Sequence, residues 1–254
     1  MCVGLGVVWP FYGFVLAHIA TGAIGLVTFW IPVIGGKGSS AHRKWGRVFI
    51  YMMLATGTIA IAISTCTLLD PIGTHQHIKD PALLANPELI RGIFGWMMQY
   101  LAILTITLAW YGWQAVSNQR DHSANLEWRN IVLHGLLLLA SCNVAWRGYL
   151  IGQPLMMGIS TIGFATVATD LYFLFKPRRG PKDWLREHLK ALVGAGISVY
   201  TAFFAFGAVR LMPSLALSPI LWAVPLTTGL GIIFYHWYQI WKSTRNKVGG
   251  VGYA

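Results

Sequence analysis

Seven long apolar stretches, separated by short polar or Pro-rich segments, run along the chain. Each is close to the roughly 20 residues that a helix needs to cross a lipid bilayer. We therefore predict an all-α fold, a polytopic helical membrane bundle with residues 1–254 forming a single transmembrane domain. The predicted spans are approximately Pro10–Ile34, Gly46–Leu69, Gly92–Val116, Glu127–Ile151, Pro154–Phe175, His188–Leu211 and Ile220–Trp241.

The breaks between the stretches refine this prediction in one place. Gly152, Gln153 and Pro154 form a very short connection between the fourth and fifth stretches. Proline suits the first turn of a helix, because its missing N–H would have no intrahelical partner there. The fourth and fifth helices should therefore pair antiparallel.

Composition excludes a soluble globular domain. Hydrophobic residues make up 56% of the chain and charged residues only 11%, whereas ordinary soluble domains carry about 25% charged residues. Aromatic residues contribute 13%, and Trp and Tyr are enriched where a membrane protein meets the two interfaces of the bilayer. The three cysteines have no CxxC spacing, so they indicate neither a disulfide framework nor a zinc site. No Walker, GxSxG, HExxH or CxxCH motif occurs, so the sequence supports no hydrolytic or nucleotide-driven activity.

The net charge of +11 is explained by topology. All of the 19 Lys and Arg residues except Lys79, Arg91, Arg147 and Arg210 fall on one side of the seven predicted spans. Basic residues accumulate on the cytoplasmic side of membrane proteins. We therefore expect an inner-membrane protein with its N-terminus outside and its C-terminus in the cytoplasm, with the lipid bilayer rather than nucleic acid as its partner.

Ionisable residues at membrane depth are the candidates for chemistry, because they are costly to bury there. Counted along the helices, His134, Asp170 and His236 share one depth in the inner leaflet, and His188 and His42 lie just below them. Two histidines at one depth on different helices could hold a b-type haem. His134 and His236 are the best-matched pair, with His188 as a substitute and Asp170 orienting a ligand imidazole.

Other interpretations of this layer remain open. The same side chains could bind a quinone, form a proton relay, hold a divalent metal ion or simply make hydrogen bonds between helices. The candidates for a metal ligand are His42 and His18, although His18 has no second intramembrane histidine at its own depth.

Four arginines are candidates for lipid or anion contacts. Arg43 lies at the cytoplasmic start of the second span, and Arg91, Arg147 and Arg210 lie at the outer ends of three spans. The outer three could converge on a carboxylate, a quinone oxygen or a lipid phosphate, or could extend separately to lipid headgroups.

Two segments resemble a known family. Lys37 and Gly38 are followed by an HRxxGR segment at 42–47, and a later stretch holds Trp184, Leu185 and His188, followed by Thr201, Ala202 and Phe203. The last span contains Trp222 and Pro225. This pattern is similar to the bacterial membrane proteins known as domain of unknown function 2306. The resemblance implies a multi-pass helical membrane protein and directs attention to His42, Arg43 and His188 at one cytoplasmic face.

Three functions follow as hypotheses. The first is a redox-associated membrane protein that carries one b-type haem or a quinone near the cytoplasmic side. The alternatives are a non-enzymatic accessory subunit that packs against other membrane subunits of a larger complex, and a small-molecule or proton transporter that uses the inner histidine layer with Asp170 as its coupling group.

Overall fold

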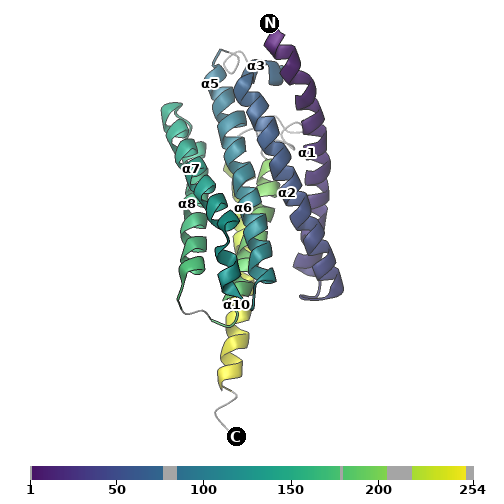
Figure 1. Cartoon of the computed structure of the whole chain (residues 1–254), viewed down its shortest axis with the longest axis vertical. Helices are drawn as coiled ribbons and strands as arrows, with labels where there is room; N and C mark the ends of the chain where they lie inside the picture. The colour runs from purple at the N-terminus through teal and green to yellow at the C-terminus, as the bar shows by residue number, and fades with distance from the viewer. Residues whose placement is uncertain (1, 77–84, 178–179, 205–218, 250–254) are drawn as a thin grey trace.

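The computed structural model describes residues 2–76, 85–177, 180–204 and 219–249, and within these ranges the regular structure is entirely helical. Its long helices run side by side along one axis (Figure 1). The elements are α1 (Cys2–Ile34), α2 (Ser40–Leu69), α3 (Pro71–Thr74), α5 (Pro87–Ile90), the π-helix η1 (Arg91–Met97), α6 (Met98–Ser117), the 3₁₀ helix η2 (His122–Leu126), α7 (Trp128–Leu150), α8 (Pro154–Phe175), α9 (Asp183–Ala202) and α10 (Pro219–Gly249).

Five of the described helices are long and apolar enough to cross a membrane. They coincide with the first five predicted spans, and the bounds Pro154–Phe175 agree to the residue, whereas α1 begins at Cys2, eight residues before the predicted start at Pro10. The prediction of an all-helical, multi-pass architecture is confirmed at this level. The sixth and seventh predicted spans overlap α9 and α10, which are long helices but are not among the five, and residues 205–211 of the sixth span lie outside the described residues. One reason for α9 is that its first eight residues include four charged ones, Asp183, Arg186, Glu187 and Lys190.

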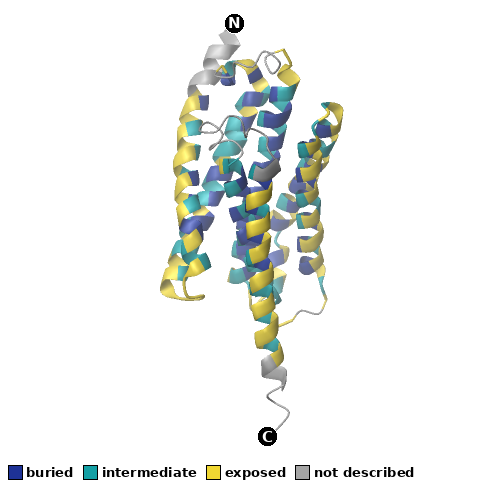
Figure 2. Ribbon diagram, turned by 180° about the vertical axis from the view of Figure 1, so that it is seen from behind, coloured by how far each residue is buried: buried dark blue, intermediate teal, exposed yellow. Residues whose placement is uncertain are grey.

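The central element is the continuous segment α5–η1–α6, Pro87–Ser117. In its most apolar 18-residue stretch, 67% of the residues are buried, whereas in the corresponding stretch of α1 only 22% are buried. Around it, α6 packs against α2, α7 and α9, while α1 lies on α2, α8 on α7 and α10 on α9. Buried residues gather on the inward faces of the helices and exposed residues on their outward faces (Figure 2).

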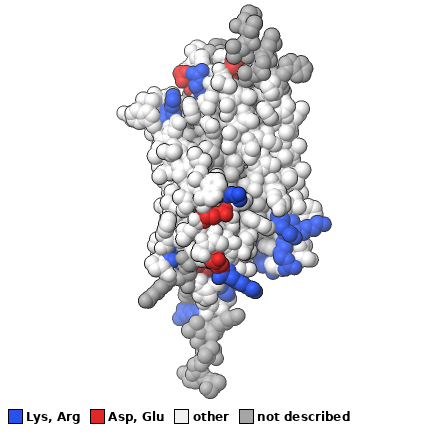
Figure 3. Space-filling model, viewed as in Figure 1, with Lys and Arg blue, Asp and Glu red and all other residues white. Residues whose placement is uncertain are grey.

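The outward faces are apolar, which is the reverse of a water-soluble protein. Leu16 and Val27 on α1, Leu139 on α7 and Tyr172 on α8 are between 67% and 70% exposed. On the face seen in Figure 3, charged residues lie near the upper end and in the lower part, with a broad uncharged surface between them. Such a surface suits hydrocarbon, so the bundle is compatible with an integral membrane protein.

The start of α2 is fixed by contacts with the end of α1. Ser39 caps α2 by accepting a hydrogen bond from the His42 N–H at 3.1 Å. Lys37 Nζ donates to the carbonyl oxygens of Pro32 and Val33, and Arg43 donates to the carbonyl of Gly38. Lys37 thus satisfies carbonyls that the end of α1 leaves unpaired, and Arg43 holds the connection that follows.

The predicted antiparallel pairing of α7 and α8 is confirmed. The two helices pack closely, and Gly152 adopts a φ of 65° in the turn between them. The Gln153 N–H donates to the Gly148 carbonyl at 2.8 Å, and Pro154 occupies the first turn of α8. A left-handed φ favours glycine, which has no Cβ to clash there.

Gly163 lets α8 approach its neighbours. A Cβ at this position would clash with Ser141 Oγ on α7 and lie 2.8 Å from Cε2 of Tyr100 on α6. Neither neighbour can move freely, because Ser141 donates to the Leu137 carbonyl at 2.7 Å and Tyr100 to the Ile159 carbonyl at 2.8 Å. The absence of a side chain at Gly163 therefore sets the spacing of α8 against α6 and α7.

We predict that Gly163→Ala lowers the thermal stability of the detergent-purified protein, on the scale of about 1–3 kcal/mol that overpacking typically costs. Gly158→Ala is the matched control on the same helix, because a Cβ there meets nothing within 4 Å. Scanning fluorimetry should show a lower melting temperature for the first variant alone. Equal melting temperatures for the two variants would contradict this account of the packing.

Candidate functional site

The buried face of α7 carries polar side chains in the middle of an apolar bundle. Asn130, His134 and Ser141 recur on this face with buried Leu137 and Val144 between and after them. The spacing of three and four residues places all of them on one side of the helix. His134 is only 1% exposed and Asn130 is fully buried, so each polar atom here needs a protein partner.

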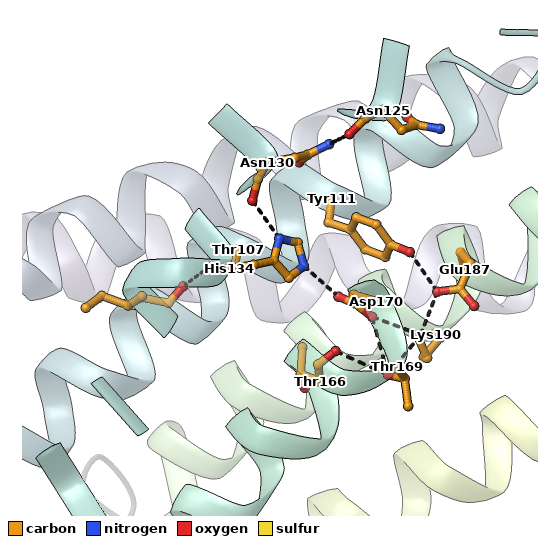
Figure 4. A network of polar contacts seen from close by, with 11 residues as sticks. Thr107, Tyr111, Asn125, Asn130, His134, Thr166, Thr169, Asp170, Glu187 and Lys190 are labelled. Atoms are coloured by element: carbon orange, nitrogen blue, oxygen red, sulfur yellow. Dashed lines mark hydrogen bonds and ion pairs between the residues drawn. The ribbon is translucent and has the colours of Figure 1, made fainter. Parts of the chain in front are cut away.

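His134 uses both ring nitrogens. Its Nδ1 lies 2.7 Å from the Asn130 carbonyl oxygen, and its Nε2 lies 3.1 Å from Oδ2 of Asp170 on α8 (Figure 4). A carbonyl oxygen can only accept, so Nδ1 carries the proton of that hydrogen bond. The contact between Nε2 and Oδ2 then requires one further proton, held by either the imidazole or the carboxyl group. His134 and Asp170 therefore share one transferable proton.

Asp170 joins this pair to a second pair on α9. Its Oδ1 lies 2.9 Å from Nζ of Lys190, and Lys190 also contacts Glu187 Oε2 at 2.5 Å. The Tyr111 hydroxyl on α6 donates to the same oxygen of Glu187 at 2.9 Å. Asp170 is fully buried, whereas the side chains of Lys190 and Glu187 are 17% and 14% exposed. These five residues, His134, Asp170, Lys190, Glu187 and Tyr111, form what we call the ionic cluster.

The ionic cluster is balanced in charge. It contains two carboxyl groups and two basic groups, so it is neutral whether the shared proton lies on His134 or on Asp170. Balance matters because an unpaired charge in a water-free interior is very costly, whereas paired and hydrogen-bonded charges are tolerated. Moving a proton within the cluster thus leaves its total charge unchanged.

Polar groups continue from the ionic cluster toward the connection between α6 and α7. Asn130 Nδ2 donates to the Asn125 carbonyl at 2.8 Å, and Asn125 Oδ1 accepts from Asn118 Nδ2 at 3.0 Å. Asn118 also donates to Gln114 Oε1 at 2.8 Å. The Asn130 Oδ1 atom is itself buried without a hydrogen-bond partner among the described residues. A polar file thus runs from His134 to the end of the bundle where α6 ends and α7 begins.

The remaining candidate histidines have other partners. His188 Nδ1 lies 2.8 Å from the Gly112 carbonyl. His42 Nδ1 contacts the Pro32 carbonyl at 3.2 Å, and His18 Nδ1 the Thr56 carbonyl at 3.2 Å. His236 lies on α10 with its ring against the adjacent Tyr235. The structure therefore brings together two of the four candidate cofactor residues, His134 and Asp170.

Haem ligation does not fit this arrangement. Both ring nitrogens of His134 are occupied by protein groups, so iron would have to displace Asp170 or the Asn130 carbonyl. His236 is on a helix that packs against α9, whereas α7 packs against α6 and α8. Across the described ranges, no group of three or more His, Cys, Asp or Glu side chains is placed to hold a metal ion. Metal binding at His42 and His18 stays a prediction, because within the described ranges neither histidine belongs to a group of three or more potential metal ligands.

Three of the four candidate arginines contact protein groups. Arg91 forms an ion pair with Glu88 and donates from Nε to the Leu68 carbonyl at 3.2 Å. Arg147 lies over the Trp96 ring at 5.1 Å, and Arg43 donates to the Gly38 carbonyl in the connection between α1 and α2. Arg210 lies outside the described residues. Each described arginine thus has its own partner, and their contacts with lipid or anions stay predictions.

Lys190, Glu187 and Tyr111 are site residues that the sequence does not single out. By charge alone, Lys190 belongs with the cytoplasmic basic residues and Glu187 has no predicted role. One signal was present, because Glu187 and Lys190 carry opposite charges three residues apart on an apolar helix and so lie on one face. Tyr111 gave no comparable signal, since tyrosines are common in membrane helices.

Comparison with known proteins gave no match, whether to family models, to curated proteins or to solved structures.

We predict that Asp170→Asn strongly destabilises the folded protein, on the scale of about 3–5 kcal/mol found when one partner of a buried ion pair is removed. The substitution leaves the Lys190 ammonium without one of its two carboxylates and His134 without its proton-sharing partner. The measurement is the thermal unfolding of the detergent-purified variant.

Glu88→Gln is the matched control for this prediction. Glu88 is also a carboxylate paired with a basic residue, but its side chain is 55% exposed. Exposed pairs contribute at most about 1 kcal/mol, so its melting temperature should stay near that of the unmodified protein. If Asp170→Asn cost no more than Glu88→Gln, the cluster would not be electrostatically coupled as described.

Asp183, the first residue of α9, is a separate charged group that precedes the sixth predicted span. Burial alone would raise the pKa of Asp183, but hydrogen bonds from Lys176 Nζ and the Gly180 N–H, both 2.8 Å, outweigh burial and lower it. A lowered pKa means that the ionised carboxylate stabilises the folded state. This stability is fully present above the ordinary aspartate pKa of about 3.9 and is lost as the pH falls through the lower folded-state value.

We therefore predict that Asp183→Asn lowers the melting temperature at neutral pH and reduces the further fall in stability that acid causes below about pH 4. The check is a series of melting curves from neutral to acidic pH. Parallel curves for the variant and the unmodified protein would show that Asp183 contributes nothing to the pH dependence.

Proposed function

We propose that the chain is an inner-membrane protein with seven membrane-spanning helices, its N-terminus outside and its C-terminus in the cytoplasm. The five confirmed apolar helices support the multi-pass part of this proposal. The positions of α9 and α10, which match the sixth and seventh apolar stretches, support the larger number. The distribution of Lys and Arg supports the orientation. The resemblance to domain of unknown function 2306 is in keeping with the same multi-pass architecture.

We further propose that the protein transports protons through the ionic cluster. One observation carries this proposal: His134 Nε2 lies 3.1 Å from Asp170 Oδ2 while both side chains are buried among apolar helices, a contact that requires a proton between them. Ionisable groups at membrane depth are rare and typically mark proton relays or ion pathways. Here the carboxyl group is also in contact with Lys190, so proton movement at Asp170 changes the charges that Lys190 and Glu187 experience.

The surroundings of the ionic cluster favour entry of protons from the proposed cytoplasmic side. The polar file through Asn130 and Asn125 leads toward the connection between α6 and α7. In the other direction the next buried residues are apolar, Leu137 on α7 and Val167 on α8. A proton at His134 therefore has a chain of polar neighbours on one side, whereas on the other side Leu137 and Val167 come first and the buried hydroxyls of Thr107 and Ser141 are bonded to backbone carbonyls of their own helices.

Transport by this cluster needs no bound cofactor, and this distinguishes it from the redox hypothesis. The accessory-subunit hypothesis draws on the exposed apolar faces, but a lipid bilayer covers such faces as well as a partner would. Proton transport is therefore the hypothesis to which the side-chain geometry adds specific support.

We expect purified protein in liposomes to admit protons when valinomycin and a potassium gradient impose an inside-negative potential. A trapped pH-sensitive dye reports the acidification. Asp170→Asn and His134→Asn should reduce uptake to the rate of protein-free liposomes, because each removes one side of the shared-proton contact.

Glu88→Gln serves as the control, since it changes an exposed carboxylate outside the ionic cluster. It should transport as the unmodified protein does. Uptake by folded, unmodified protein that is no faster than in protein-free liposomes would contradict proton transport.

A further inference from the structure

A cavity of about 430 Å³ lies where α8, α9 and α10 meet, beside the ionic cluster. Glu187 belongs to both, since it lines the cavity and also contacts Lys190 and Tyr111. The volume lies within the usual range for small-molecule sites. Anything bound in the cavity would therefore touch a member of the ionic cluster.

The charges around the cavity are not balanced. Lys176 and Arg186 line it together with Asp183, which pairs with both of them at 2.8 Å and 3.8 Å. Glu187 is already paired with Lys190. One carboxylate thus serves two cations, which leaves one positive charge in excess among the described residues of the cavity and the ionic cluster.

Arg186 has unused hydrogen-bonding capacity at this cavity. Its Nη1 is 3.8 Å from Asp183, a long separation for an ion pair, and its Nε is buried without a hydrogen-bond partner among the described residues. The Arg186 side chain as a whole is 38% exposed, so only the buried Nε–H is left unpaired, and an unpaired buried donor is unfavourable. A planar anionic group would accept from the guanidinium edge and supply the missing negative charge.

The rest of the wall is aromatic. Tyr172 and Phe173 come from α8, and Trp237, Tyr238 and Trp241 come from α10. Aromatic faces and edges bury an apolar or aromatic body, while cations at the same wall hold a charged head. An aromatic wall with cations beside it therefore favours a molecule that has both an apolar or aromatic body and a negatively charged head.

We propose that this cavity binds an organic anion with an aromatic or apolar body, held by Arg186 and Lys176. The proposal rests on the proposed function, because an anion bound against Glu187 would regulate proton movement through the ionic cluster. The same chemistry is found in a soluble carboxylate and in an anionic lipid headgroup with its attached chains, and the experiment below separates these two sources.

The test measures binding of phenylpropionate to the full-length protein in phosphatidylcholine nanodiscs by titration calorimetry, with empty discs subtracted. Phenylpropanol and phenylpropylamine have the same aromatic body with a neutral or a cationic head. Phenylpropionate should bind best, and Arg186→Gln should weaken its binding by about tenfold or more, as expected when a charge-assisted hydrogen bond is lost. Lys182→Gln is the control, because Lys182 is a nearby basic residue that contacts Ser243 and does not line the cavity.

The variant Asp170→Asn separates this proposal from proton transport. If it folds, it should still bind phenylpropionate although it transports no protons, so failure of transport alone leaves the cavity assignment standing. Competition by phosphatidylglycerol added to the discs would identify a lipid headgroup as the anion, and undiminished binding would identify a soluble one. Equal binding of all three probes, no binding of phenylpropionate, or equal effects of Arg186→Gln and Lys182→Gln would overturn the proposal.

Discussion

The placement of Asp170 between two basic groups is the constraint on which the rest of the structure depends. The carboxyl group is fully buried, with His134 on one oxygen and Lys190 on the other. A carboxylate in that position is tolerable only if both partners are held in place. Three helices, α7, α8 and α9, must therefore keep their mutual positions, and Tyr111 on α6 ties the fourth member, Glu187, to the central helix.

The close packing of α6, α7 and α8 is what makes such short contacts possible. Gly163 is nearly two turns from Asp170 on α8 and lets that helix approach Ser141 and Tyr100. Hydrocarbon gives helices no hydrophobic reason to associate, so small residues and interhelical hydrogen bonds carry the association. The contact at Gly163 and the contact between His134 and Asp170 both stabilise the interface between α7 and α8. The first allows the two helices to approach closely, and the second adds an electrostatic interaction.

The positions of the helices could be predicted from the sequence more accurately than which helices pack against each other. Lengths of apolar runs depend on the chain alone, so the span Pro154–Phe175 was correct to the residue and the end of α1 at Ile34 was correct, although α1 begins at Cys2 and not at Pro10. Because the three residues lie at equal depth, the sequence suggested that His134 could contact either Asp170 or His236. Depth alone does not show which of these two contacts forms. The choice is made by which helices touch, since α7 packs on α8. Only the short turn at Gly152 carried that information in the sequence.

Charge counting could not have identified the whole cluster, because a charged residue near a helix end has two possible environments. Lys190 lies in the second turn of α9, where a lysine can reach the aqueous side or turn inward. It turns inward because Asp170 and Glu187 are there to pair with it. Lys190 is thus counted among the basic residues that predict the membrane orientation, and in the structure it is also the buried counter-ion of Asp170 and Glu187. An isolated Lys190 would have no reason to leave water, so its position depends on the two carboxylates, and theirs on it.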